Sequence, residues 1–462
     1  MSFKRYGKVY LNEQLYPFFQ QEVQHQIYKL KSLGVNDKEV IGLNFKSNLE
    51  FLKVYLACRE LNLIPLIIYK TLEAKEEAKK FGASLLIKET ENKLEYIKIS
   101  SKKFLNNKEL NNVAVICRSS GTTGMPKLIA WNHNGINFQS TATFNHLNYL
   151  TDDKLLISLP LWCAYGLSIL HMWEKYKMDL ILADTLNPKH LCEIINITKS
   201  SAYDSTPVFY SFLYNFLVKN PNYVSKISSI RIWGCGGDIL PLKLAKLWYN
   251  LTGKPILDGY GQVEAGPNIS INTLENFRFG SVGKCLKNIQ TWVEKDGELV
   301  VESPSIMEGY WVFENGDYTF NIADKTLYTG DIVNIDEEGY IKIIGRKKNI
   351  IIVNGYNINP ETIEQTLLNH KNIEEVGVTY IDMNDLGHKK LTALVKLNSK
   401  DTNIIEDIKK WSLEKLHQEL FPKYYFIIES LPYHSNGKID RIALKNLASQ
   451  CYSSTQENLI SY

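Results

Sequence analysis

A short apolar run that breaks abruptly into a loop of hydroxyls and glycines is the most constraining feature of this chain. Residues 113–117 read VAVIC, and residues 118–127 read RSSGTTGMPK. A strand that ends in such a loop presents backbone N–H groups, hydroxyl donors and one ammonium group to a single point, which suits a polyphosphate. The spacing between Gly121 and Lys127 does not fit the Walker pattern of P-loop proteins.

The first hundred residues alternate between strand and helix patterns. A helix is predicted to begin at Ser47, where Glu50 completes a capping box, and the charged stretch 71–81 predicts another. Apolar runs of strand length lie before, between and after these helices, at residues 39–43, 63–69 and 84–87. This order favours a doubly wound α/β unit, with a parallel sheet covered on both faces.

The pattern changes twice in the second half of the chain. From about Gly280, short alternating runs predict an antiparallel or barrel-like subdomain. After residues 345–348, Asn359 and Pro360 have the types expected at the N-cap and first turn of a helix. The remainder to about Leu447 predicts a small α+β domain, and the last fifteen or so residues are expected to form a loose tail.

Composition narrows the class of protein. A chain of 462 residues exceeds one compact core, so two or more domains are expected. The net charge of +3 gives no electrostatic case for nucleic acid or a membrane surface, and no apolar run has the length of a membrane span. Seven scattered cysteines without a C-x-x-C pair favour a reducing compartment, and the N-terminus lacks the apolar core of a signal peptide, so a soluble cytoplasmic protein is expected.

Four further segments carry candidate chemistry. A tyrosine between two glycines, in DGYGQVE at 258–264, can expose its ring for stacking, and Glu264 offers a hard oxygen to Mg²⁺. The other three segments are GCGGD at 234–238, YTGD with GR at 328–331 and 345–346, and PYHSNGKIDR at 432–441. Together with the loop at 118–127 they resemble, in order, the signatures of the adenylate-forming superfamily. That superfamily comprises acyl-CoA synthetases, aryl-acid ligases, peptide-synthetase adenylation domains and firefly-type luciferases.

The resemblance implies a fold and a reaction. It implies a large N-terminal domain of α/β subdomains with a barrel-like part, residues 1–346, and a small mobile C-terminal lid, residues 347–462, with Lys348 at the hinge. A carboxylic acid and MgATP would form an acyl-adenylate and pyrophosphate, and the acyl group would pass to a thiol. Mobile ammonium groups can stabilise the charge that builds up as a carboxylate attacks the α-phosphate.

The resemblance also assigns roles to residues. Lys438, Glu264 and Lys127 would be catalytic, with Glu264 the ligand of Mg²⁺. Asp331 would bind the ribose hydroxyls, and Arg346 the ribose and phosphate. The remaining residues predicted to bind ATP are Ser119, Ser120, Gly121, Thr122, Thr123, Gly124, Gly236, Gly237, Asp258, Gly259 and Tyr260.

The chain departs from the superfamily at two positions. Val263 stands where a threonine is usual, which removes one hydroxyl from the phosphate site. Cys163 stands where a histidine is usual, in the predicted acyl-binding segment Cys163, Ala164, Tyr165 and Gly166. A packed thiol is a simpler interpretation of Cys163 than a nucleophile, which needs a depressed pKa.

The substrate is only partly constrained. Relatives that activate amino acids place an aspartate near this segment, and its absence here counts against an α-amino acid, so an aryl or short acyl acid is favoured. Only 24 residues follow Lys438, too few for a carrier domain, so the thiol is expected to be CoA or a separate carrier protein. Two alternatives stay open: transfer of the adenylate to an amine or other non-thiol acceptor, and a degenerate adenylate-binding protein. Retention of Lys127, Glu264, Asp331, Arg346 and Lys438 argues against the second.

Overall fold

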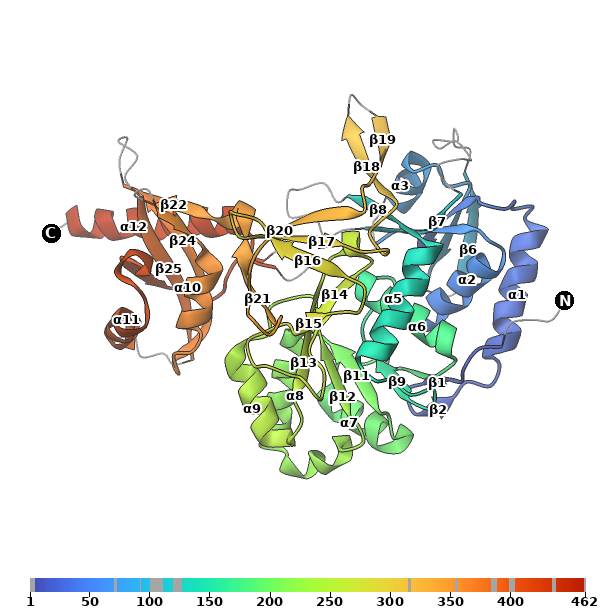
Figure 1. Cartoon of the computed structure of the whole chain (residues 1–462), viewed down its shortest axis with the longest axis horizontal. Coiled ribbons are helices and arrows are strands. Elements are labelled where there is room, and N and C mark those ends of the chain that lie inside the picture. Colours follow the sequence, from blue (N-terminus) through green and yellow to red (C-terminus); the bar gives the residue numbers. More distant parts are fainter. Residues whose placement is uncertain are drawn as a thin grey trace.

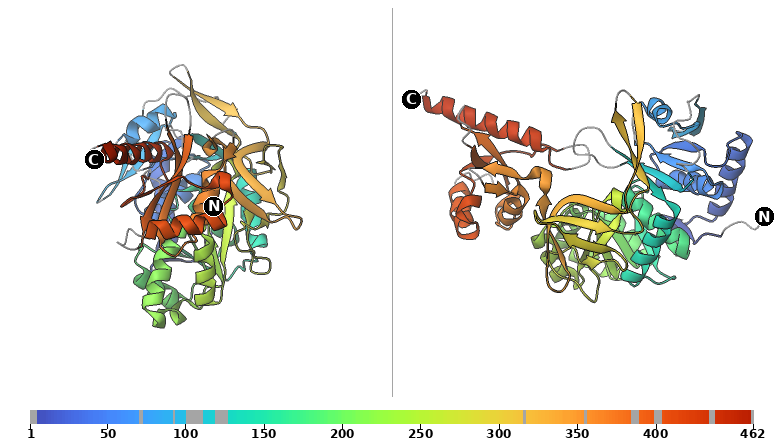
Figure 2. Two further views of the ribbon diagram at one scale, coloured as in Figure 1. Left: turned by 90° about the vertical axis from the view of Figure 1, so that its left-hand side faces the viewer. Right: turned by 45° about the horizontal axis from the view of Figure 1, so that its top comes forward.

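The computed structural model describes residues 5–69, 73–91, 93–99, 111–118, 127–314, 317–353, 356–383, 389–398, 404–433 and 438–460. The N-terminal three quarters form a broad body, and a smaller C-terminal unit lies at the opposite end of the long axis (Figures 1 and 2). Among the described residues, no helix combines the length and apolar character needed to cross a membrane.

The first sheet confirms the α/β pattern expected from the first hundred residues. Its eight strands run in the order β19-β18-β8-β7-β4-β3-β5-β6, and β5, β3, β4 and β7 are mutually parallel. Ser47 caps the following helix α2 by accepting a hydrogen bond from the backbone of Glu50, as predicted. The strands of the early part are β3 (Val40–Asn44), β4 (Ile64–Ile67), β5 (Leu85–Glu89), β6 (Leu94–Lys98), β7 (Val113–Arg118) and β8 (Leu128–Asn132).

A second sheet of nine strands, in the order β15-β14-β13-β12-β11-β9-β10-β1-β2, completes the large body. Its centre, from β10 through β9, β11 and β12 to β13, is parallel, so these strands end at one edge, where ligands of such sheets bind. The strands are β1 (Val9–Leu11), β2 (Gln14–Leu15), β9 (Lys154–Ile157), β10 (Asp179–Leu182), β11 (Ala202–Ser205), β12 (Ile232–Cys235), β13 (Ile256–Gly261), β14 (Asn268–Ile271) and β15 (Lys284–Cys285).

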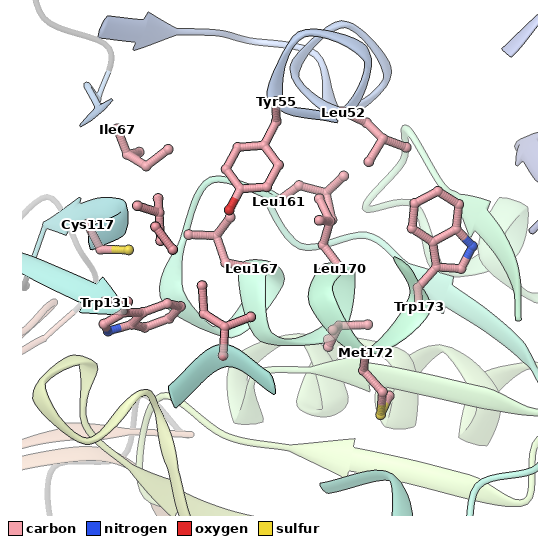
Figure 3. Packing of buried hydrophobic residues seen from close by; sticks show 14 of the residues in the cluster. Leu52, Tyr55, Ile67, Cys117, Trp131, Leu161, Leu167, Leu170, Met172 and Trp173 are labelled. Atoms are coloured by element: carbon pink, nitrogen blue, oxygen red, sulfur yellow. The ribbon is translucent and has the colours of Figure 1, made fainter. Parts of the chain in front are cut away.

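Helices separate and cover the two sheets. One buried cluster joins both sheets through α1 (Phe19–Ser32), α2 (Asn48–Glu60), α5 (His133–His146) and α6 (Ala164–Tyr176). Figure 3 shows this packing, in which Leu52 and Tyr55 of α2 face residues of α6. The Tyr55 hydroxyl lies 2.7 Å from His171 Nε2, which satisfies both polar groups in the core. The outer faces carry α3 (Ala74–Lys80) on the first sheet, and α7 (Pro188–Thr198), α8 (Pro207–Lys219) and α9 (Leu242–Thr252) on the second.

The strands expected after Gly280 are antiparallel. Four form a sheet in the order β16-β17-β20-β21, while β18 and β19 extend the first sheet by pairing with β8. Their bounds are β16 (Gln290–Val293), β17 (Glu298–Glu302), β18 (Gly309–Glu314), β19 (Asp317–Ile322), β20 (Thr326–Ile335) and β21 (Ile341–Arg346). Short 3₁₀ turns are η1 (Pro221–Tyr223), η2 (Ser225–Ile227), η3 (Val263–Ala265), η4 (Lys347–Asn349) and η5 (Gln418–Leu420).

The C-terminal unit is the small α+β structure predicted, with one correction. Asn359 accepts from the backbone of Glu361 and caps α10, as expected. The tail predicted for the last fifteen or so residues is instead helical as far as Ile460, since it continues α12, whose Leu444 and Ala448 are fully buried in a small core against β25. The elements are β22 (Ile351–Val353), β23 (Tyr356–Ile358), α10 (Pro360–Leu367), β24 (Ile373–Asp382), β25 (Lys389–Leu397), α11 (Ile404–Lys415), β26 (Tyr424–Ile427) and α12 (Arg441–Ile460).

Candidate active site

A cavity of about 580 Å³ brings together most of the residues predicted from the sequence. Its size is typical of small-molecule sites. The predicted residues that line it come from both sheets, from η3 and η4, and from the C-terminal unit: Lys127, Ala164, Tyr165, Gly236, Gly237, Gly259, Tyr260, Glu264, Arg346, Lys348 and Lys438.

Four cationic side chains line this cavity. Lys127, Arg346, Lys348 and Lys438 come from positions far apart in the sequence. The pKa of Lys348 is lowered, first by burial and then by the positive charges of Arg346, Lys438 and Lys127, against an opposing effect of Asp331. Like charges gathered in a partly buried space disfavour one another, and an anionic ligand relieves that repulsion. This donor set therefore fits a polyphosphate.

A hydrogen-bond network fixes the wall beside the cations. Asp331 Oδ2 accepts from the Tyr260 hydroxyl and from Gln262 Nε2, both at 2.6 Å. Arg346 Nε lies 2.7 Å from Asp331 Oδ1. Burial and the neighbouring carboxylate of Asp331 raise the pKa of Tyr260, so its hydroxyl stays a donor. The aromatic ring is thus held in one position at the cavity wall.

Glu264 supplies the carboxylate expected for a metal-bound nucleotide. Its backbone oxygen accepts from Met307 N at 2.9 Å, which anchors η3 at the cavity. Within the part of the chain that the structure describes, no cluster of three or more His, Cys, Asp or Glu side chains could hold a metal ion. One carboxylate combined with phosphate oxygens is typical Mg²⁺ coordination, so these residues fit a metal delivered with the nucleotide.

Val263, the position that departs from the superfamily, also lines the cavity. Its backbone oxygen accepts from Trp131 Nε1 at 2.7 Å, so the turn is held by a buried indole. The apolar side chain therefore adds no hydrogen-bond donor to the site.

The wall of the cavity also contains a residue that sequence reasoning missed, Asp204. The Tyr165 hydroxyl donates to Asp204 Oδ1 at 2.7 Å, and both residues line the cavity. A Cβ atom on Gly234 would lie 2.0 Å from the same carboxylate oxygen, so only glycine leaves room for it. Burial raises the pKa of Asp204 to about 6, while the hydrogen bond from Tyr165 acts in the opposite direction.

The position of Asp204 weakens the sequence argument against an amino-acid substrate. The segment 159–166 has no acid, which counted against an amino-acid substrate, but the neighbouring strand β11 places a carboxylate beside Tyr165. The sequence did offer one signal, an aspartate in the short segment AYDS that precedes Thr206 and Pro207. In the structure this segment is the fully buried strand β11.

Within the described part of the chain, four predicted residues do not line the cavity: Asp258, Asp331, Cys163 and Gly166. Asp331 lies behind Tyr260 and Arg346, and Asp258 is buried, with a pKa well above its usual value because of that burial. Cys163 is the N-cap of α6, where its Sγ accepts from the backbone N of Gly166 at 3.3 Å. Burial raises the pKa of Cys163, which supports a packed thiol rather than a nucleophile. The phosphate-loop residues Ser119, Ser120, Gly121, Thr122, Thr123 and Gly124 lie outside the described residues.

The hydrogen bonds around Lys348 divide between the two parts of the chain. Lys347 Nζ bonds Asp296 and Glu298 of the large body, at 2.6 and 2.8 Å. Asn349 Nδ2 donates instead to Glu361 of the C-terminal unit, at 2.6 Å. Lys348 therefore lies between a residue held by one part and a residue held by the other.

Comparison with known proteins agrees with this geometry. The family described as AMP-binding enzyme matches residues 19–311. A probable CoA ligase of Humulus lupulus is 27% identical over 75% of this chain and 63% of its own length. A long-chain-fatty-acid–CoA ligase of Escherichia coli is 28% identical over 73% of this chain and 62% of its own length. The chain thus spans less than two thirds of these two relatives.

Solved structures share the whole architecture. The o-succinylbenzoate CoA synthetase of Bacillus subtilis, solved with its acyl-adenylate intermediate, superposes with a TM-score of 0.79 at 22% identity. That match covers 96% of this chain and 95% of the other. At this identity the likeness establishes the fold, a large N-terminal domain followed by a smaller C-terminal one.

Proposed function

This chain belongs to the AMP-binding enzyme family, and we propose that it activates a carboxylic acid with ATP and then transfers the acyl group to a thiol. The observation that carries the proposal is the convergence of four cations and Glu264 on one cavity, which is also lined by residues of α6 and β11. That arrangement offers a polyphosphate site and a separate acid site in one space. The CoA ligases among its relatives support the same reaction class.

In the first step, a carboxylate oxygen attacks the α-phosphorus of ATP, and the bond to the bridging oxygen of the β-phosphate breaks. Pyrophosphate leaves and an acyl-adenylate remains. Lys438 and Arg346 stabilise the charge at the α-phosphate, Lys127 holds the outer phosphates, and Tyr260 presents its ring to the adenine. Magnesium, when bound through Glu264, would neutralise charge on the phosphate oxygens.

The second step uses the same acyl carbon. A thiol sulfur attacks the carbonyl of the adenylate, the bond to AMP breaks, and the thiol proton is released. We infer that residues 347–462 rotate between the steps about Lys348, so that Lys438 serves only the first. The divided hydrogen bonds of Lys347 and Asn349 support a hinge at this point.

The thiol is CoA or a separate carrier protein, with CoA supported by the relatives. An aryl or short acyl acid fits a cavity that must also hold the nucleotide. We place the reaction in the cytoplasm, since all seven cysteines, each in the described part of the chain, are free thiols.

Exchange of labelled pyrophosphate into ATP, with a panel of single acids, tests the proposal. At least one acid should support exchange, and addition of CoA should then yield its thioester. If exchange occurs, no thioester forms with CoA, and an amide forms when amines are added, a non-thiol acceptor would be favoured. ATP binding without exchange for any acid would favour a non-catalytic adenylate-binding protein.

A further inference from the structure

The acid end of the cavity has an apolar wall with one buried carboxylate in it. Leu147 of α5, Ile169 and Met172 of α6, and Ile271 of β14 line the same space as Asp204. The Asp204 residue is only 6% exposed. A charged group among aliphatic side chains is costly unless it is paired, so its presence here needs a reason.

No positive charge pairs with Asp204 in the described part of the chain. The titratable groups around it are Tyr149, Tyr165, Tyr203, Tyr210 and Cys235, and burial raises the pKa of each, so all are neutral near pH 7. Arg231 lies over the ring of Tyr149, 5.9 Å from its centre, and this cation is already engaged because its Nε donates to Asp153 Oδ1 at 3.1 Å.

Only half of the carboxylate is satisfied by the protein. Oδ1 accepts from Tyr165, and among the described residues no hydrogen bond is formed by Oδ2. Because Asp204 lines the cavity, this second oxygen is available to whatever occupies the acid end. A buried acceptor of this kind selects a ligand that brings a donor, since a ligand without one leaves it unpaired.

The position of Asp204 also limits which part of the substrate it meets. Asp204 belongs to β11 in the centre of the second sheet. Lys127 instead precedes β8 of the first sheet, and the other three cations come from β21, η4 and the C-terminal unit, so a different part of the cavity wall carries them. The reacting carboxylate must lie near those cations. A group that contacts Asp204 is therefore at the other end of the acid.

We propose that Asp204, positioned by Tyr165, binds an amino group that the substrate acid carries at the end remote from its reacting carboxylate. This inference rests on the proposed function and narrows it to an amino-substituted aryl or short acyl acid. An ammonium group would donate a hydrogen bond to Oδ2 and would also bring the positive charge that pairs with the carboxylate. A hydroxyl group would donate the hydrogen bond but would bring no charge. The amino group of an aryl acid is neutral, so it would make the same hydrogen bond to Oδ2 more weakly.

Matched pairs of acids test the inference by pyrophosphate exchange. The pairs are β-alanine with propionate, γ-aminobutyrate with butyrate, and para- and meta-aminobenzoate with benzoate, with para-hydroxybenzoate added for a hydroxyl donor. In at least one pair, the kcat/KM of the amino-substituted acid should exceed that of its unsubstituted partner by about a hundredfold or more. Asp204→Asn should lower that ratio at least tenfold, mainly through the amino member.

Asp184→Asn is the matched control, because Asp184 follows β10 of the same sheet and is exposed. It should leave every ratio unchanged. Tyr165→Phe, which removes the hydrogen bond to Oδ1, should reduce the same ratio by a smaller factor.

Calorimetric binding of the same acids separates failure of this inference from failure of the proposed function. If no acid supports exchange, the proposed function fails, and the inference stands only if the amino acids bind to the wild type and not to Asp204→Asn. A preference for the unsubstituted or hydroxyl member of the panel, or ratios unaffected by Asp204→Asn, would overturn the amino-group assignment and leave the proposed function intact.

Discussion

Arg346 Nε lies 2.7 Å from Asp331 Oδ1, and β20 and β21 place the two residues directly opposite each other. Arg346 is the last residue of β21 and immediately precedes the turn that contains Lys348. The same carboxylate accepts from Tyr260 through its other oxygen. One buried aspartate thus connects the end of β21 with the aromatic wall of the cavity, so the protein's own contacts hold this part of the wall in place.

Asp331→Asn should weaken ATP binding. The neutral amide loses the charge-assisted contact to Arg346 and one acceptor for Tyr260, and hydrogen bonds to charged groups contribute about 1.5–3 kcal/mol. We expect the KM for ATP to rise about tenfold to a hundredfold, with little change in the KM for the acid. Exchange kinetics measure both, and Asp324→Asn, at an exposed position before β20, is the control. Equal increases in both KM values would indicate a general loss of structure instead.

Val263→Thr should strengthen ATP binding. The substitution conserves shape and adds a hydroxyl at the cavity wall, where a neutral hydrogen bond contributes about 0.5–1.5 kcal/mol. The KM for ATP is expected to fall about twofold to tenfold. A rise, accompanied by lower thermal stability, would mean that the valine packs against the core more than it faces the phosphates.

Cys163→Ser should retain full activity, because serine preserves the N-cap interaction with Gly166 and the thiol is not the nucleophile. Cys163→Ala should lose about 1 kcal/mol of stability through loss of the cap, with the exchange rate unchanged. Urea denaturation and exchange assays measure the two effects. Loss of exchange in the serine variant would contradict the role assigned to this thiol.

Asp204 should destabilise the free protein as the pH rises. Its pKa is raised to about 6 in the fold, so the native state holds the proton more tightly than the unfolded chain, and stability falls as pH increases through that value. That shift corresponds to about 3 kcal/mol. Asp204→Asn should therefore be more stable than the wild type by roughly this amount at about pH 8, with the difference vanishing below about pH 4.

Denaturation curves at the two pH values, with Asp184→Asn alongside, measure this difference. A gap that does not depend on pH would show that the ionisation of Asp204 is not its source. A stabilising effect at high pH would fit a residue retained for binding at a cost in stability.

Much of the fold could be predicted because its determinants are local in the sequence. The capping box at Ser47 and the Asn359–Pro360 cap predicted α2 and α10 correctly, and the run at 113–117 is the central strand β7. The part of α12 beyond about Leu447 was predicted wrongly as a loose tail, because its one buried apolar position, Ala448, becomes informative only when β25 is present to bury it.

The site could be predicted only where motifs are contiguous. Tyr260, Glu264 and Lys438 belong to short signatures, and all three line the cavity. Asp204 belongs to no signature, and its proximity to Tyr165 depends on β11 lying beside β12, so that its side chain lies over Gly234. Such a relationship arises from sheet order, which the sequence alone does not specify.

The catalytic role that we propose for Lys438 tests the account most directly, because this residue belongs to the C-terminal unit and still lines the cavity. Lys438→Ala should reduce acid-dependent pyrophosphate exchange by about a thousandfold or more, while transfer from a preformed acyl-adenylate to CoA continues near the wild-type rate. Lys410→Ala, on the exposed face of α11, should leave both steps unchanged. Exchange at the wild-type rate in Lys438→Ala would contradict the central claim.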